Sequence, residues 1–242
     1  AGRSLVRNPV FVISALLILF VLFVAAFPQV FTSQDPGFGD LGRANQPPGP
    51  EHPFGTSRQG YDIMARTFWG ARTSVIIGFF AMIGSTLIGG TIGALAGYIG
   101  GWFEELLMGA TNVVLAIPSI IVLILISISL PQSSIWSLAV VIGITSWPWT
   151  ARAVRAQASS VATREHIDVA RLSGARVPGI LLRDVLPYIL SYTVMAFVLQ
   201  VAGAILAESA LSMLGLGPSG ANSLGIQLHW ALAFQAVGGG AW

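Results

Sequence analysis

Residues 10–27 read VFVISALLILFVLFVAAF, an apolar run in which Ser14 is the only polar side chain. A helix needs about 20 mostly apolar residues to cross the hydrocarbon core of a membrane. Arg3 and Arg7 precede the run, as they would in a secretory signal peptide. The run is long for the apolar segment of a signal, however, and no cleavage site of small residues follows it. The stretch therefore predicts a first membrane span.

The rest of the chain has the same character. Of its 242 residues 54% are hydrophobic and only 9% are charged, against about 25% charged residues in an ordinary soluble domain. Four more apolar segments predict further spans, at residues 74–98, 106–130, 135–150 and 188–206. The predicted fold class is an all-α, polytopic transmembrane helix bundle with five spans. We expect a sixth span beyond residue 242, since the chain stops at a Gly-rich stretch where that span would begin.

Several classes of function are disfavoured by what the sequence lacks. All twelve basic residues are Arg, so the chain has no Walker A lysine to reach nucleotide phosphates. It has no Cys, and its three His residues are scattered, which argues against thiol chemistry and a zinc site. No ionisable residue lies near the middle of a span, where a proton- or sodium-driven carrier needs one. A net charge of +2 is too small to indicate nucleic-acid binding.

The Arg residues predict the orientation, because the cytoplasmic side of a membrane protein is enriched in positive charge. Eight Arg fall on one side of the predicted spans and four, accompanied by four acids, fall in the first loop. The eight are Arg3, Arg7, Arg152, Arg155, Arg164, Arg171, Arg176 and Arg183. We therefore expect a cytoplasmic amino terminus, an external loop at 32–72 and a basic cytoplasmic loop at 152–187.

Features inside the spans indicate packing more clearly than transport. Small residues recur every four positions in the second span, which lets two helix backbones approach closely; they are Ser85, Gly89, Gly93 and Gly97. Helix packing is the favoured interpretation of this row, and a moving seam is the alternative. Pro118 and Pro148 can kink the third and fourth spans.

An acidic residue, Glu208, lies at the external end of the fifth span. We expect Glu208 to bond helix-end or loop groups on the external side, with the lining of an entrance as the second interpretation. Gly215 and Gly217 follow it in the same external segment.

The long loop at 152–187 carries the strongest signal. Thr163 is expected to cap a short helix over residues 165–173, with Glu165 in its first turn, where the helix dipole favours an acid. Gly174 follows as the residue type that tolerates a left-handed helix end. This helix mixes charged side chains with four apolar ones, Ile167, Val169, Ala170 and Leu172. We therefore interpret it as a docking surface; the alternative is a loop folded on its own bundle.

The residues of this loop resemble a family motif. The run Glu165-His166-Ile167-Asp168-Val169-Ala170-Arg171, then Gly174 and Leu186-Pro187, is similar to the "EAA" loop of binding-protein-dependent ABC importer permeases. Asp168-Val169-Ala170 stands where the family has E-A-A. The resemblance implies that this loop docks an ATPase subunit through Glu165, Ile167, Asp168, Ala170, Arg171, Gly174 and Pro187.

Two other stretches resemble the dipeptide and oligopeptide branch of that family. Residues 52–56, HPFGT, with residues 70–74, GARTS, are similar to the external segment before its second span. Residues 204–217, AILAESALSMLGLG, are similar to its A-I-L-x-E-A-x-L-S-F-L-G-L-G. The match most resembles the second permease subunit of the pair.

The resemblance implies a type I ABC importer permease in a bacterial inner membrane, moving di- or oligopeptides. It also implies an amino-terminal span with its external loop (1–71) and an importer domain (72–242). The implied partners are a homologous permease, two ATPase subunits (or one fused pair) that bind ATP and Mg, an extracytoplasmic substrate-binding protein and membrane lipid; the chain itself would hold no cofactor. Another cargo, such as haem or a nickel chelate, and a secondary transporter remain as alternatives.

Overall fold

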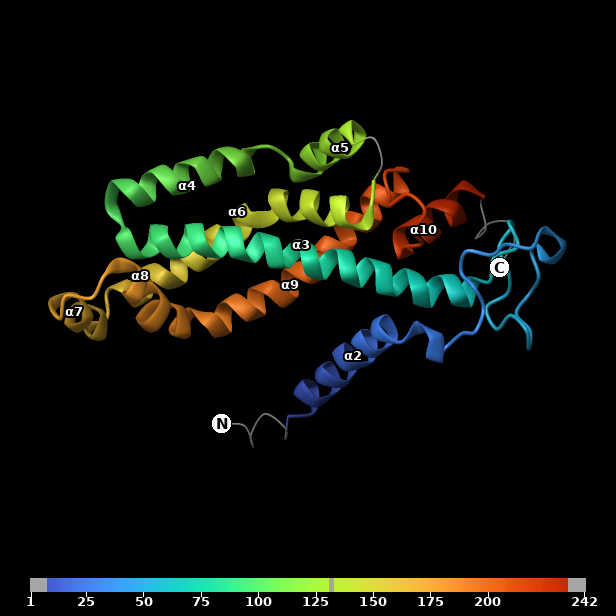
Figure 1. Ribbon diagram of the computed structural model, residues 1–242, viewed down its shortest axis with the longest axis horizontal. Coiled ribbons are helices and arrows are strands. Elements are labelled where there is room, and N and C mark those ends of the chain that lie inside the picture. The colour runs from blue at the N-terminus through green and yellow to red at the C-terminus, as the bar shows by residue number, and fades with distance from the viewer. Residues whose placement is uncertain (1–7, 131–132, 235–242) are drawn as a thin grey trace. The chain divides into compact units, whose positions relative to one another are not determined.

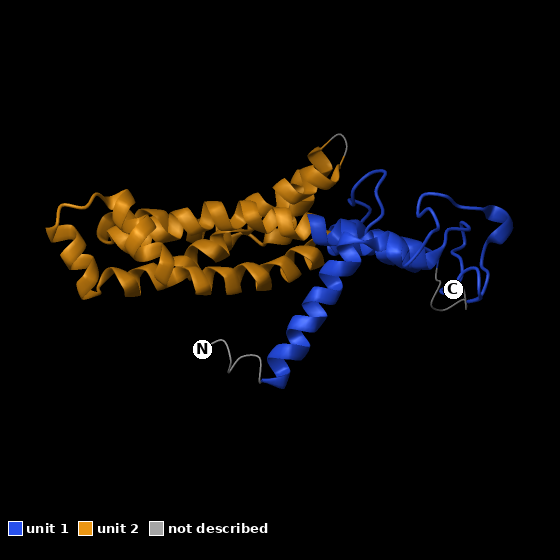
Figure 2. Ribbon diagram, turned by 60° about the horizontal axis from the view of Figure 1, so that its bottom comes forward, with its two compact units in different colours: residues 1–76, 209–242 blue, residues 77–208 orange. Residues whose placement is uncertain are grey.

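The computed structural model describes residues 8–130 and 133–234. Within these ranges the backbone forms helices and loops, and its β-type pairing is limited to two isolated bridges, Gly39 with Tyr61 and Thr56 with Asp62. Contacts divide the chain into two compact units, one of residues 1–76 with 209–242 and one of residues 77–208 (Figure 2). Each unit is described by itself below. The structure is thus all-α, as the sequence predicts.

The helices follow the predicted order (Figure 1). They are α2 (Pro9–Ala26), α3 (Ile63–Ile99), α4 (Gly101–Ala116), α5 (Ser119–Ser129), α6 (Ile135–Ala162), α7 (Glu165–Leu172), α8 (Val177–Ile180), α9 (Leu186–Met213) and α10 (Leu224–Ala233), with short 3-10 turns at Pro28–Val30 and Leu41–Arg43 and a π-helical turn, η3, at Leu181–Val185. The helix α3 runs without a break across the domain boundary predicted at residues 71 and 72.

Among the described residues, three helical segments are long and apolar enough to cross a membrane: α2, α3 and the continuous helix over residues 177–213. A fourth span is obtained if α4 and α5 count as one, since they are bent by 76° at a short break. Pro118 lies at this break, as the N-cap of α5, because a proline lacks the N–H that would continue the helix. The described helices therefore agree broadly with a polytopic bundle.

The predicted fourth span lies in α6, which is not among the helices that pass this test. This helix carries a polar stretch around Thr145 and Ser146, and it has many buried residues, among them Leu138, Ile142 and Val154. The second predicted kink, Pro148, lies inside this helix without ending it.

In the first unit the loop between α2 and α3 is fixed by a buried hydrogen bond between His52 and Asp62. His52 Nδ1 lies 2.7 Å from Asp62 Oδ2, and both side chains are almost fully buried. The other oxygen of Asp62 accepts a hydrogen bond of 2.6 Å from the backbone N–H of Ala65, in the first turn of α3. Asp62 therefore satisfies one of the free N–H groups at the start of α3.

The carboxyl-terminal part of the same unit contacts the start of α3. Asn222 accepts a hydrogen bond from Arg66 Nε at 3.1 Å and donates one to the carbonyl oxygen of Arg66 at 2.5 Å. Gln227, in α10, donates to that same carbonyl. These bonds hold α10, which ends at Ala233, against the start of α3.

One local prediction about the loop at 152–187 is wrong. Thr163 does not cap α7: it ends α6, and its hydroxyl donates to the carbonyl of Ser160. The last span, predicted at residues 188–206, belongs to a longer helix that runs from residue 177 through Pro187. A π-type hydrogen bond from Leu186 N–H to the carbonyl of Leu181 precedes the proline, and such a turn accommodates the missing N–H.

Candidate functional site: a helix fixed to the bundle

The short helix α7 has one buried and one exposed side. Ile167 has an exposed fraction of 0% and packs in a core of unit 2 with Val154, Ala158 and Val161 of α6. Ala170 lies at the edge of the same core. These two residues were expected on the docking surface. The structure places them against their own bundle instead, because apolar residues three apart share one side of a helix.

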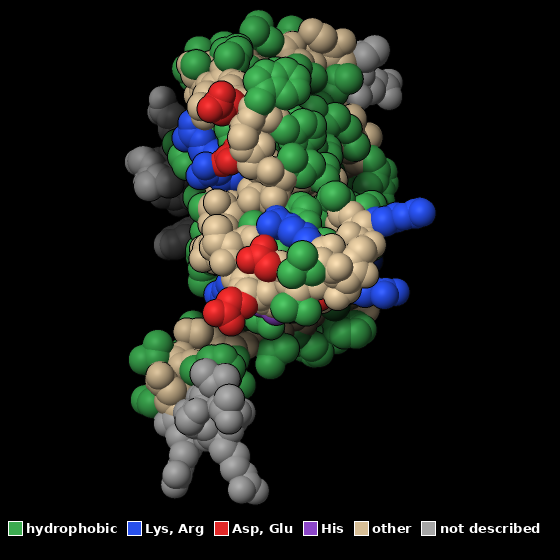
Figure 3. Space-filling model, turned by 90° about the vertical axis from the view of Figure 1, so that its left-hand side faces the viewer, with side chains coloured by type: hydrophobic (Ala, Val, Ile, Leu, Met, Phe, Trp, Pro, Cys, Tyr) green, Lys and Arg blue, Asp and Glu red, His purple; other side chains and the backbone are tan. Residues whose placement is uncertain are grey.

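The opposite side of α7 presents both apolar and charged groups. Val169 is 61% exposed and Leu172 is 89% exposed, and Glu165 and Asp168 are exposed beside them. Figure 3 views the end of unit 2 that carries α7 and α8, where apolar, acidic and Arg side chains share one surface. Of the four apolar residues that the sequence analysis placed on the docking surface, Val169 and Leu172 are the two that the fold leaves exposed.

Arg171 fastens this helix to the end of α3. Its Nη1 lies 3.3 Å from Asp168 Oδ1, and its Nε donates a hydrogen bond of 3.3 Å to the hydroxyl of Tyr98. The hydrogen bond to Tyr98 is the main cause that raises the pKa of Arg171. The guanidinium also lies over the Tyr98 ring, 5.0 Å from its centroid. Arg171 thus acts inside the chain, and Asp168 remains 61% exposed.

Gly174 ends α7 in a left-handed conformation, with φ of +77°. The N–H of Ala175 bonds the carbonyl of Ala170 at 3.1 Å, and the N–H of Gly174 bonds that of Arg171 at 3.0 Å. These two bonds form a Schellman motif, which satisfies the last carbonyls of a helix. Pro187, the remaining residue predicted in this loop, lies exposed on the continuing helix.

The small residues of α3 pack against α6. A methyl group at Gly97 would lie 2.5 Å from the carbonyl oxygen of Arg155, and one at Gly93 would lie 2.9 Å from the N–H nitrogen of the same residue. Gly89 lies equally close to the backbone around Thr150. Ser85 Oγ lies 3.4 Å from Thr150 Oγ1, which in turn bonds Gln200 Oε1 at 3.0 Å. Backbone-to-backbone contact along α3 and α6 is the reason that these positions are small.

The residues predicted at the external end are structural in character. Glu208, near the end of α9, has an exposed fraction of 0% and is bonded within the protein. Gly215 has φ of +81°, and the bonds of Gly215 N–H to Ser212 and of Leu216 N–H to Leu211 form a second Schellman motif. A side chain at Gly217 would meet Ser212 Oγ at 2.6 Å.

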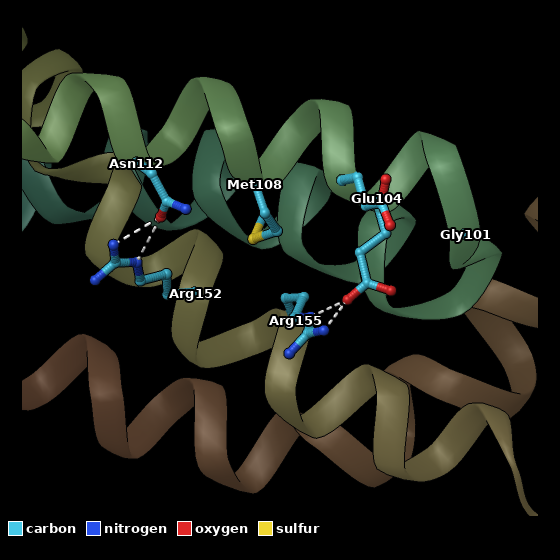
Figure 4. A pocket seen from close by; sticks show the side chains of 7 residues that line it. Gly101, Glu104, Met108, Asn112, Arg152 and Arg155 are labelled. Carbon is cyan, nitrogen blue, oxygen red and sulfur yellow. Dashed lines mark hydrogen bonds and ion pairs between the residues drawn. The ribbon is translucent and has the colours of Figure 1, made fainter.

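A polar cavity that the sequence did not reveal lies between α4 and α6, with a volume of about 530 Å³. Figure 4 shows that Glu104 points to Arg155 at one end and Asn112 meets Arg152 at the other, with Met108 between them. Glu104 and Arg155 form an ion pair. A signal was present in the sequence, since Arg152 and Arg155 are three residues apart on one helix face.

The comparisons with known proteins agree on one family. Residues 89–241 match the binding-protein-dependent transport system inner membrane component, and residues 1–48 match the N-terminal TM domain of oligopeptide transport permease C. Three relatives of similar sequence bear the names of peptide permeases. The oligopeptide transport system permease protein OppC of Bacillus subtilis (strain 168) is 31% identical over 87% of this chain and 68% of its own length.

The other two relatives are slightly more similar in sequence to this chain. OppC of Mycobacterium tuberculosis (strain H37Rv) is 36% identical over 89% of this chain and 74% of its own length. A putative peptide permease protein of Brucella suis is 34% identical over 96% and 76%. Together with the apolar helices, these matches show that the chain belongs to the family of inner membrane components of binding-protein-dependent transport systems.

Proposed function

We propose that this chain is one of two permease subunits of an ATP-driven importer that brings di- or oligopeptides into the cytoplasm. The named relatives are peptide permeases, and the similarity to them extends over most of the chain. The resemblance of residues 52–56, 70–74 and 204–217 to the peptide branch supports the same cargo. ATP and Mg bind to partner subunits in this proposal, because the sequence holds no Lys for a Walker A loop.

The observation that carries the proposal is the two-sided helix α7. Ile167 and Arg171 fix it to the bundle, while Leu172 and Val169 are exposed. An exposed apolar patch on an anchored helix is typical of a protein interaction site. An ATPase subunit that contacts Leu172 would therefore move α7, and through Arg171 and Tyr98 it would move the end of α3. A few kcal/mol of differential binding is enough to shift a two-state equilibrium of this kind.

The orientation follows from the same assignment. If α7 contacts an ATPase, residues 150–187 lie in the cytoplasm, together with the amino terminus. A binding protein would then meet the loop that the His52–Asp62 pair holds at the start of α3, on the outer side of a bacterial inner membrane. The second, homologous permease would complete the path.

The test is transport by the complete importer in vesicles. The two permeases and the ATPases are reconstituted, and a labelled peptide is supplied with the binding protein and ATP. We expect uptake that requires ATP and the binding protein, and we expect the ATPases to remain bound to this chain during purification. Uptake that follows a proton or sodium gradient without ATP would contradict the proposal.

A further inference from the structure

The cavity between α4 and α6 is lined by two charged side chains, Arg152 and Glu105, that no oppositely charged group neutralises among the described residues. Arg152 donates from Nε at 3.3 Å and from Nη2 at 2.7 Å to Asn112 Oδ1, which is a neutral acceptor. In the described ranges neither Arg152 nor Glu105 has an ion-pair partner, while Glu104 and Arg155 pair with each other. A guanidinium has five N–H donors, so Arg152 keeps donors for a further acceptor.

The length of the cavity wall that α4 forms corresponds to a short peptide. Asn112, which holds Arg152, follows Glu105 by seven residues on α4, a distance of about 10 Å along the helix axis at 1.5 Å per residue. An extended peptide spans at most about 3.3–3.6 Å per residue, so three residues cover a similar length. The amine and phosphate of a phospholipid headgroup are separated by only a few bonds and fit this spacing less well.

The size and the place of the cavity agree with such a ligand. Its volume of about 530 Å³ lies in the range of about 300–1,000 Å³ that small-molecule sites have. Its first residues, Gly101 and Glu104, come just after Tyr98, which bonds the helix α7. The cavity thus lies at the end of the bundle from which an imported peptide would leave.

We propose that this cavity binds a short zwitterionic peptide, with the peptide's carboxylate on Arg152 and its amine on Glu105. The proposal rests on the proposed function and assigns to it an exit-side site. Recognition of the two termini leaves the peptide's side chains uncontacted by these charges, so the site would accept many sequences of about three residues.

The first experiment measures binding of labelled trialanine to the complete importer in lipid nanodiscs, without the binding protein. We expect Glu105→Gln and Arg152→Gln each to weaken binding about tenfold, since each removes one charged partner of a terminus. Asp184→Asn and Arg183→Gln make the same charge changes outside the cavity and should bind as the wild type does. Thermal unfolding of each variant checks that it is folded.

Modified probes show which terminus each residue contacts. N-acetyl-trialanine should bind the wild type weakly and should lose nothing further in Glu105→Gln. Trialanine amide should behave in the same way with Arg152→Gln. Unchanged trialanine binding in both variants, or none in the wild type, would overturn the site. Loss of a bound phosphatidylethanolamine from both variants in native mass spectrometry, without trialanine binding, would assign the cavity to lipid instead.

Failure of this site and failure of the proposed function give different results. If wild-type vesicles import labelled peptide with the binding protein but the cavity variants bind trialanine normally, only the exit-side site is wrong. If the complete importer moves no peptide at all, the cargo assignment is wrong.

Discussion

The Nε of Arg171, in the last turn of α7, donates a hydrogen bond of 3.3 Å to the hydroxyl of Tyr98, at the end of α3. The residue before Tyr98 is Gly97, whose backbone lies against Arg155 and Ser159 of α6. The last turn of α3, at Gly97 and Tyr98, therefore contacts both the exposed helix α7 and the part of α6 that lines the polar cavity. This connection gives a physical route by which a contact on α7 affects the bundle.

The first prediction concerns this hydrogen bond. Arg171→Gln removes the charge over the Tyr98 ring and should lower the ATPase rate stimulated by peptide-loaded binding protein several-fold. Tyr98→Phe keeps the ring and removes only the hydroxyl, so its effect on the rate should be smaller. The hydrogen bond that it removes contributes about 1 kcal/mol or less, because Arg171 is partly exposed. The measurement is the stimulated ATPase rate of the reconstituted importer. Equal losses in Arg176→Gln, an exposed Arg outside this contact, would contradict the assigned role.

The second prediction separates the two sides of α7. Leu172→Ser changes an exposed side chain and should leave thermal stability within about 0.5 kcal/mol. It should nevertheless weaken binding of the ATPase subunit about tenfold, as expected for an apolar interface residue.

Ile167→Ala is the matched variant on the buried side. It removes atoms from a packed core and should cost about 2–5 kcal/mol of stability. Thermal unfolding and co-purification of the ATPase measure the two effects. If Leu172→Ser retained the ATPase as well as the wild type does, the exposed side of α7 would not be the docking surface.

The third prediction concerns the positive φ of Gly174. No atom lies within 4 Å of the position that a Cβ would occupy there, so a side chain is opposed by backbone strain and not by a clash. Gly174→Val should cost about 1–2 kcal/mol locally, displace the end of α7 and abolish peptide import. Gly174→Asn should retain most import, because Asn tolerates the left-handed region. Peptide uptake and peptide binding to the binding protein are measured together, and near-normal uptake by Gly174→Val would rule out the coupling role.

The sequence predicted which segments form helices better than it predicted where each helix begins and ends. Local rules on proline and helix ends predict the break at Pro118 and the end of α7 at Gly174. The start of α3 at Ile63 did not follow, because Arg66 and Arg72 conceal a helix that extends beyond its apolar part. The helix continues through Pro187 because a π-turn precedes it, and no residue pattern predicts such a turn.

The assignment of the docking residues had a similar limit. The motif located α7, but it could not say which of its residues face the bundle, since that depends on α6 and α3 packing beside it. Ile167 and Leu172 are both apolar in the sequence, and only the fold makes one buried and the other exposed. The cavity at Arg152 was missed for the same reason, because its two walls are 40 residues apart.

The fourth prediction tests orientation, and the natural absence of Cys makes it direct. Glu51 is 77% exposed in the loop before α3, and Ala175 is exposed after α7. A Cys at Glu51 should react with a membrane-impermeant reagent in intact cells, and a Cys at Ala175 should react only after the membrane is opened. The reverse result would place α7 outside and exclude an ATPase as its partner.

The last prediction concerns the contact of α3 with α6. A methyl group at Gly93 would lie 2.9 Å from the backbone nitrogen of Arg155 and 3.0 Å from Val154 Cβ, so Gly93→Ala must push the helices apart. Overpacking of this kind costs about 1–3 kcal/mol. Gly90→Ala is the matched control, because no atom lies within 4 Å of its added methyl group and alanine favours a helix over glycine by up to about 1 kcal/mol.

Thermal unfolding of the purified importer should therefore show a lower midpoint for Gly93→Ala and an unchanged or slightly higher one for Gly90→Ala. Because the backbone of Arg155 lies directly against Gly93, the same displacement should disturb the ion pair between its guanidinium and Glu104. Equal midpoints for the two variants would mean that α3 and α6 are not in contact at Gly93. Packing against α3 would then not be what fixes the position of Arg155 in the cavity.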